Sequence, residues 1–249
     1  LGPYKLGMLG APTTYLLYGA IGVMAAVQFL RIWQINGHVF QRPVPAFDRY
    51  PFKQVALLNL VYMASFGSEL AVVSMLPLYF LDTFDISPML AGMLGGSFAL
   101  MNLFGRPGGG YLADRYGRKL ITILMLAGIA VGYFFMARID SSWPLPLAVT
   151  LVVLCSIFVQ GGCGAVYASV PLVKRRLTGQ VAGMAGAYGN VGGVVFLVVL
   201  ALVPSDQFFL VLGAIALAIM SLVMIFMDEP DPQTSEVMPD GSVRMIDVT

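Results

Sequence analysis

Long apolar runs separated by short polar connections make up most of this chain. A helix that crosses a bilayer needs about 20 predominantly apolar residues. A window search finds such runs at Thr13–Trp33, Ala56–Leu81, Met89–Leu112, Leu120–Ala137, Leu145–Val173, Val181–Val203 and Phe208–Met227. The pattern therefore predicts an all-α polytopic membrane protein in which seven helices span the bilayer.

Composition narrows the class of protein further. Residues of the set AVILMFWYC form 58% of the 249 residues, and charged residues form 11%. About a quarter of the residues of a soluble domain are charged, because its surface must be solvated. These values disfavour a soluble enzyme, a disordered protein and a secreted disulfide scaffold, and the net charge of +1 argues against a nucleic-acid partner.

Basic residues gather in every second connection, after the first, third and fifth spans. They are Arg31, Arg42, Arg49, Lys53, Arg115, Arg118, Lys119, Lys174, Arg175 and Arg176. The other connections carry Asp82, Asp85, Asp140 and Asp206, with Arg138 as the single basic residue. The positive-inside rule then predicts cytoplasmic basic loops and an outside N-terminus. The proline- and acid-rich residues 228–249 are expected to form a flexible cytoplasmic tail.

The second span carries an acid near its middle, Glu69. A carboxylate there is costly unless it is protonated, paired or in contact with a wet cavity. Tyr62 and Phe66 precede it at helical spacing, so the three side chains share one face. Glu69 is either satisfied by a Ser, Tyr or Arg of a neighbouring helix or forms a proton site on a transport pathway.

The third span carries Arg106, about 12 Å inside its cytoplasmic end by helix rise. The side chain either snorkels to the interface or binds a small planar anion, which its fork of donors matches. Asn102, one turn earlier, can add a hydrogen bond. Pro107 and the following glycines permit a bend or a close backbone approach.

The sixth span is rich in glycine. Its glycines are Gly183, Gly186, Gly189, Gly192 and Gly193, and Asn190 lies among them. Small residues let membrane helices pack closely, which is sufficient to explain the glycines. A buried amide needs partners, so Asn190 either joins two helices or lines a substrate pathway.

A polar cluster from Gly110 to Lys119 joins the third and fourth spans. A tight basic turn explains its cations but not Asp114. That carboxylate could reach the cytoplasmic N-terminus of the sixth span, where the helix dipole favours negative charge. Such a contact would serve as a gate if it broke when the cytoplasmic face opened.

Cys155 and Cys163 lie too far apart on one helix to bridge, and we expect them to be core residues. No cluster of metal ligands, nucleophile–base pair or paired intramembrane carboxylates is present in the sequence. We therefore predict no enzyme activity, no metal and no cofactor.

Two of these segments resemble a known family. Residues 110–119 read G-x-x-x-D-R-x-G-R-K, which is similar to the loop motif of the major facilitator superfamily. Residues 183–193, GMAGAYGNVGG, resemble the nitrate signature of the nitrate/nitrite porter family within it, and FGSE and FGRPGG at residues 66 and 104 resemble its seventh and eighth helices.

The resemblance implies the sixth helix and the second six-helix bundle of a twelve-helix transporter. Its parts would be residues 1–55 (helix 6 and the central loop), 56–227 (the bundle) and 228–249 (the tail). It places a nitrate-binding Arg at Arg106, aromatic walls at Tyr62 and Phe66, and the signature around Asn190. The gating motif would comprise Gly110, Asp114, Arg115, Gly117 and Arg118. The first half is missing, and the opening Leu1 also suggests truncation.

The expected function is secondary active transport of nitrate, and of nitrite, across the cell membrane by alternating access. Proton symport and nitrate/nitrite exchange both remain open, with the proton and the missing half as further partners. The alternatives are a facilitator-fold porter for another small anion and a seven-helix receptor or sensor.

Overall fold

The computed structural model of the chain describes residues 10–37, 49–229, 233–237 and 241–247. Two compact units are present, residues 1–46 and 47–249. The first contains the helix α2 (Ala11–Asn36), which begins with a proline in its first turn and is exposed along nearly all its length. Most of the loop after it, including Arg42, lies outside the described residues.

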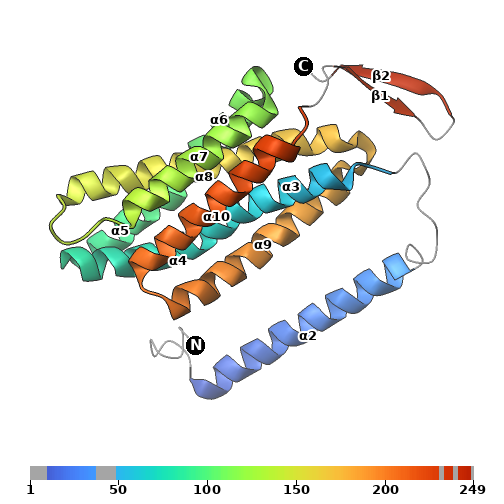
Figure 1. Cartoon of the computed structure of the whole chain (residues 1–249). Helices are drawn as coiled ribbons and strands as arrows, with labels where there is room; N and C mark the ends of the chain where they lie inside the picture. The colour runs from blue at the N-terminus through green and yellow to red at the C-terminus, as the bar shows by residue number, and fades with distance from the viewer. Residues whose placement is uncertain (1–9, 38–48, 230–232, 238–240, 248–249) are drawn as a thin grey trace. The chain divides into compact units, whose positions relative to one another are not determined.

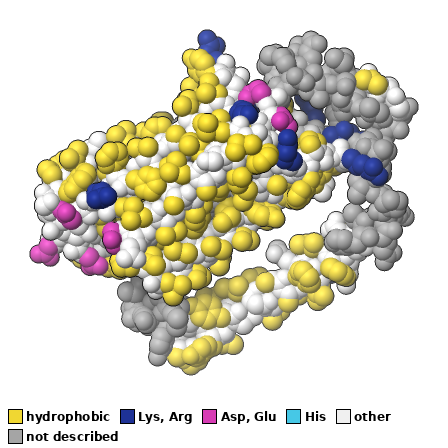
Figure 2. All heavy atoms as spheres, viewed as in Figure 1, with side chains coloured by type: hydrophobic (Ala, Val, Ile, Leu, Met, Phe, Trp, Pro, Cys, Tyr) yellow, Lys and Arg dark blue, Asp and Glu magenta, His cyan; other side chains and the backbone are white. Residues whose placement is uncertain are grey.

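The second unit is a bundle of helices packed side by side (Figure 1). Its helices are α3 (Phe52–Tyr62), η3 (Met63–Gly67), α4 (Ser68–Phe84), α5 (Pro88–Leu100), α6 (Asn102–Tyr116), α7 (Arg118–Met136), α8 (Leu145–Val173), η4 (Arg175–Leu177), α9 (Thr178–Leu202) and α10 (Ser205–Phe226). Apolar side chains cover the flank of the bundle seen in Figure 2, and charged ones gather towards its ends.

The number of spans predicted from the hydropathy pattern is confirmed. Within the described residues, seven helical segments are long and apolar enough to cross a membrane. They coincide with the predicted runs, and most extend a few residues further at their ends. The second span is continuous through α3, η3 and α4, whereas a turn at Met101 divides the third into α5 and α6.

The ends of the bundle differ from the boundaries that the sequence suggests. The second unit begins at residue 47 rather than 56, because α3 already starts at Phe52 and its first turn bonds to residues beyond α10. The predicted tail contains an antiparallel hairpin of β1 (Gln233–Val237) and β2 (Val243–Asp247). The hydropathy pattern along the chain does not predict so short a hairpin.

The segment η3 is a single π-helical turn inside a transmembrane helix. Two serines bond to backbone carbonyl groups here: Ser65 Oγ donates to Val61 O at 2.9 Å, and Ser68 Oγ donates to Ala64 O at 2.6 Å. The hydroxyl of Tyr133 on α7 donates to Ser68 Oγ at 2.8 Å. A π-turn widens the helix by one residue and is frequent at functional sites. The turn η3 therefore marks a candidate site within this bundle.

Glycines bring the backbones of α6 and α8 into direct contact. A Cβ atom added to Gly109 would collide with the backbone of Gly161, and one added to Gly164 would collide with the backbone of Arg106. Small residues permit this approach in membrane helices. The contact fixes the height of Arg106 against α8, which positions the groups described below.

The substitution Gly109→Ala is expected to destabilise the bundle by about 1–3 kcal/mol, because overpacking that meets backbone cannot be relieved by a side-chain rotation. The melting temperature of the purified protein in detergent measures the effect. The neighbouring Gly108→Ala is the matched control, since no described residue outside the backbone of its own helix lies within 4 Å of its added Cβ. Equal melting temperatures for the two variants would show that α6 and α8 do not depend on this contact.

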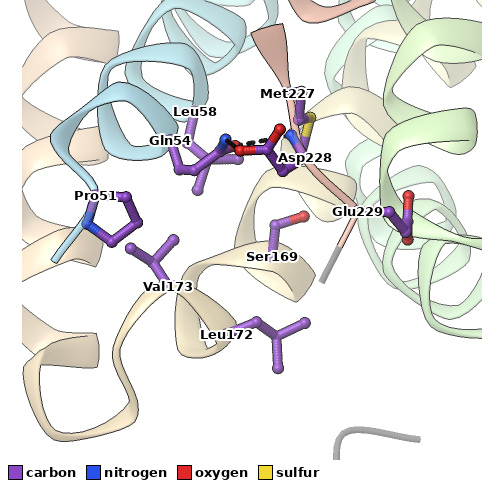
Figure 3. Close-up of a pocket in the computed structure, with 9 residues that line it drawn as sticks. All are labelled: Pro51, Gln54, Leu58, Ser169, Leu172, Val173, Met227, Asp228 and Glu229. Carbon is purple, nitrogen blue, oxygen red and sulfur yellow. Dashed lines mark hydrogen bonds between the residues drawn. The ribbon is translucent and has the colours of Figure 1, made fainter. Parts of the chain in front are cut away.

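The residues that follow α10 tie two helix starts together. Asp228 pairs with Lys53 (Oδ2 to Nζ, 2.9 Å) and accepts from Gln54 Nε2 at 2.6 Å, beside a pocket of about 160 Å³ (Figure 3). The hydrogen bond from Lys53 lowers the pKa of Asp228. The pair therefore contributes its stability above the ordinary carboxyl pKa and loses it as the pH falls through the lowered value.

Glu229 caps the N-terminus of α7. Its two carboxylate oxygens accept from the backbone N–H groups of Arg118 at 2.6 Å and Lys119 at 2.7 Å. The first N–H groups of a helix have no partner within the helix, and the dipole favours a negative charge there. Gly117 precedes this turn with a φ of 100°, a conformation that glycine adopts without strain.

The substitution Glu229→Ala is expected to remove about 1 kcal/mol of capping free energy and to speed amide exchange at the start of α7 about fivefold. Hydrogen–deuterium exchange of a peptide that covers residues 117–122 measures it. Asp114→Asn is the control, because Asp114 bonds to the Arg118 side chain rather than to this backbone. Unchanged exchange in Glu229→Ala would refute the capping role.

Candidate functional site

Glu69 and Arg106 form an ion pair inside the bundle. Glu69 lies in the first turn of α4 and is 6% exposed, and its Oε2 is 2.9 Å from Nη2 of Arg106 on α6. An acid within a membrane span needs such a partner. The pairing satisfies Glu69 through an Arg, one of the two alternatives left open by the sequence, and it directs Arg106 inward rather than towards an interface.

Two amides complete the polar cluster. Arg106 Nε donates to Oε1 of Gln160 at 3.1 Å, and Asn102 Nδ2 lies 3.5 Å from Oε1 of Glu69. Asn102 thus contacts the acid, while the sequence suggests a role next to the substrate. A guanidinium carries five N–H donors, and the described residues accept from Nε and Nη2. Three donors therefore remain for another acceptor.

Aromatic rings border this cluster. The guanidinium carbon of Arg106 lies 5.4 Å from the centre of the Phe66 ring, within the range of a cation–π contact. Phe66 stacks on Tyr62 with ring centres 5.1 Å apart, and Tyr167 of α8 meets Tyr62 edge-on at 5.2 Å. The predicted aromatic pair thus lies beside Arg106, next to the wide turn η3.

The glycines of α9 divide into two groups. Gly189 packs on the rings of Tyr62 and Phe66, Gly192 on Met63, and Gly193 on Leu70, so that an added Cβ would collide at each. In contrast, a Cβ atom added to Gly183 would meet no described residue within 4 Å outside the backbone of its own helix, and one added to Gly186 would lie 3.8 Å from the hydroxyl of Tyr167. The three C-terminal glycines therefore serve close packing against the helix that carries Glu69.

Asn190 does not join two helices in this structure. Its side chain is exposed, and its Nδ2 donates to the backbone oxygen of Gly186, one turn earlier in the same helix, at 2.8 Å. The helix-to-helix role that the sequence left open is therefore not realised within the described residues.

The loop cluster contains a contact that the sequence misassigned. Asp114 does not reach the start of α9: its Oδ1 pairs with Nη2 of Arg118, four residues on, at 2.9 Å. The capped N-terminus here is that of α7, and Glu229 supplies the carboxylate. Arg118 follows so closely along the chain that its side chain is within reach of Asp114 without any contact to the start of α9. Arg115 lies over the ring of Tyr116 at 5.9 Å.

Gly110 also belongs to that cluster, and it lies against α8. A Cβ atom added there would be 3.6 Å from the backbone oxygen of Gly164, which is ordinary contact. The gating role of this group of residues stays a prediction.

Sequence reasoning missed Gln160 and Tyr167. Gln160 is fully buried at the middle of an otherwise apolar span, and its amide contacts the central cation. The signal was present, since a Gln within the apolar run of residues 145–173 is anomalous for the same reason as Glu69. Cys155 and Cys163 are buried and free, as expected.

The arrangement suits the binding of a small anion. Arg106 is charged, its side chain is 30% exposed, and beside flat aromatic surfaces it keeps donors that no described residue uses. A planar oxyanion can accept two parallel hydrogen bonds from such a fork. Bound there, it would compete with Glu69 for the same cation.

Comparison with known proteins identifies relatives of this chain. A nitrate/nitrite transporter (NrtP) of Picosynechococcus is 42% identical over 242 residues, which cover 87% of this chain and 45% of that protein. NrtP of Nostoc punctiforme is 38% identical over 229 residues, which cover 91% of this chain and 46% of that protein. The high-affinity nitrate transporter 2.3 of rice is 39% identical over 55% of this chain and 28% of its own. The chain thus spans less than half the length of these relatives.

The family comparison covers most of the chain. The family model of the Major Facilitator Superfamily matches residues 1–197, which include every helix from α2 to the glycine-rich part of α9. The relatives carry the names of transporters rather than of enzymes. The superfamily that the loop motif predicts is therefore confirmed: this multi-pass membrane chain belongs to the major facilitator superfamily.

Proposed function

We propose that this chain forms the second half of a secondary active transporter that carries nitrate, and nitrite, across the cell membrane by alternating access. The observation that carries the proposal is the half-buried Arg106, which lies on the Phe66 ring and keeps three donors that no described residue accepts from. The names of the relatives support nitrate and nitrite as substrates.

The other half of the site comes from a first six-helix bundle. Facilitator transporters bind their substrate near the midplane, between two related halves. The exposed Asn190 and the exposed apolar residues of α9 would face that half or the lipid. The basic ends of α6 and α8 would lie in the cytoplasm, together with the C-terminal residues.

Charge balance links the anion to Glu69. Arg106 and Glu69 are neutral as a pair, so an arriving monoanion adds one negative charge to a site of low dielectric constant. Protonation of Glu69 removes that charge and frees the guanidinium for the anion. If transport is proton symport, Glu69 is the proton site that we propose.

The membrane potential sets the number of protons. Moving a monoanion inward costs about 2.3 kcal/mol per 100 mV. Nitrate carried with one proton has no net charge, so the membrane potential does not drive its uptake. Uptake therefore uses more than one proton, or exchanges nitrate for nitrite in place of symport.

The substitution Arg106→Lys is expected to raise the KM for nitrate about tenfold or more, because a point charge cannot replace two directed hydrogen bonds of about 1.5–3 kcal/mol each. The measurement is nitrate uptake by the complete gene product in cells that lack nitrate transport. Arg138→Lys, an exposed residue after α7, is the matched control. Full nitrate affinity in Arg106→Lys would rule out the clamp.

The substitution Glu69→Gln is expected to flatten the pH dependence of nitrate uptake, because an amide cannot carry the coupled proton. Initial rates between pH 5 and 8, at fixed membrane potential, measure the profile. Asp206→Asn, at the exposed start of α10, is the control. A pH profile equal to that of the unchanged protein would remove Glu69 from the proton path and favour exchange.

A further inference from the structure

We propose that Gln160 is a positioning residue, which fixes the guanidinium plane of Arg106 through Nε and so sets the direction of the donors offered to the anion. The inference rests on the proposed function, in that the anion is the substrate of Arg106. The contact itself is the 3.1 Å hydrogen bond from Arg106 Nε to Gln160 Oε1.

The close packing of α6 and α8 places Gln160 there. A Cβ atom added to Gly105, the residue before Arg106, would collide with Cβ of Gln160. Gly109 and Gly161 remove side chains from the next turn of the same contact. The Gln160 stem therefore lies directly against the α6 backbone, and its amide has little freedom to turn away.

Chemistry fixes which end of the amide faces the cation. Nε of an arginine can only donate, so the oxygen of Gln160 faces it and the nitrogen lies on the other side. That nitrogen, Nε2, is buried, and no described residue accepts from it. A buried donor without a partner is unfavourable. Stability of the core alone does not explain a glutamine here, whereas the contact with Arg106 does.

Holding Nε leaves the anion-binding donors oriented. With Nε bound to Gln160, Nη2 bound to Glu69 and the ring of Phe66 below, the guanidinium has a defined plane. When an anion displaces Glu69 from Nη2, Gln160 remains on Nε and preserves that plane. Gln160 thus holds the guanidinium both with and without the anion, while Glu69 binds it only in the anion-free site.

A neutral amide suits this role better than a carboxylate does. Glu69 already compensates the charge of Arg106. A second carboxylate at residue 160 would make the site negative, and it would repel the anion. The amide supplies the acceptor geometry without that charge.

The test is a double-mutant cycle in the complete gene product, with the nitrate KM as readout. Gln160→Met keeps the length of the side chain and removes the acceptor, and it is expected to raise KM about tenfold. In an Arg106→Lys background the same change is expected to have no further effect, because lysine has no Nε–H for Gln160 to accept from. Gln160→Glu is expected to weaken nitrate uptake more than Gln160→Met does.

Controls separate positioning from folding. Thr122→Val, on α7, removes another buried oxygen that has no hydrogen-bond partner among the described residues, and it is expected to leave KM unchanged. The amount of each variant in the membrane and its melting temperature in detergent are measured in parallel. The inference would be overturned if the nitrate KM of Gln160→Met equalled that of the unchanged protein. It would also be overturned if Gln160→Met raised KM equally in the unchanged and the Arg106→Lys backgrounds, because a purely structural effect adds independently of Arg106.

A spectroscopic readout does not depend on transport. The protein is labelled with ¹⁵N-arginine, and the Nε–H resonance of Arg106 is assigned by its loss in Arg106→Lys. In the unchanged protein this hydrogen is expected to exchange slowly with water. In Gln160→Met its resonance is expected to broaden. Identical resonances in both proteins would refute the positioning role even if nitrate were not the substrate. A different result would refute the proposed substrate alone: the unchanged protein takes up no nitrate, but the Arg106 resonance still depends on Gln160.

Discussion

The energetic cost of placing charge in an apolar bundle is the constraint on which this structure depends. Arg106 and Glu69 both lie within predicted spans, and neither is tolerable there alone. Removing one partner of a buried pair leaves an uncompensated charge, which is strongly destabilising. The surrounding features serve to keep the two side chains together: glycines bring α6 against α8, and a wide turn precedes Glu69.

The same constraint makes the site adaptable. A fully satisfied ion pair would be inert, but Arg106 retains donors that no described residue uses, and its aromatic neighbours offer surface without competing acceptors. In the proposed function, an incoming anion would meet a cation that is already oriented and that keeps donors no described residue uses. The site would then exchange one negative partner for another, which requires less reorganisation than assembly of a site from separate charges.

Sequence reasoning was strongest where a residue type conflicted with its surroundings. The spans followed from hydropathy, and Glu69 and Arg106 stood out because charge is rare in such runs. Their mutual contact did not follow, since it depends on how α4 and α6 both pack against α8. Gln160 carried the same kind of signal more weakly, because an uncharged amide is less anomalous. The role of Glu229 could not be foreseen, because its partners are backbone groups of a helix more than a hundred residues away.

The π-turn at Met63–Gly67 has a consequence for how this helix can change in length. A π-turn holds one residue more than the α-helical turn it replaces. Deleting a single residue within it would restore a regular α-helix and leave α3 and α4 in phase, because the wide turn absorbs the extra residue. The side chains inside the turn, that of Phe66 among them, would be repositioned relative to Arg106. The extra residue thus decides how the side chains of this turn are presented, and it does so without rotating the helix on either side.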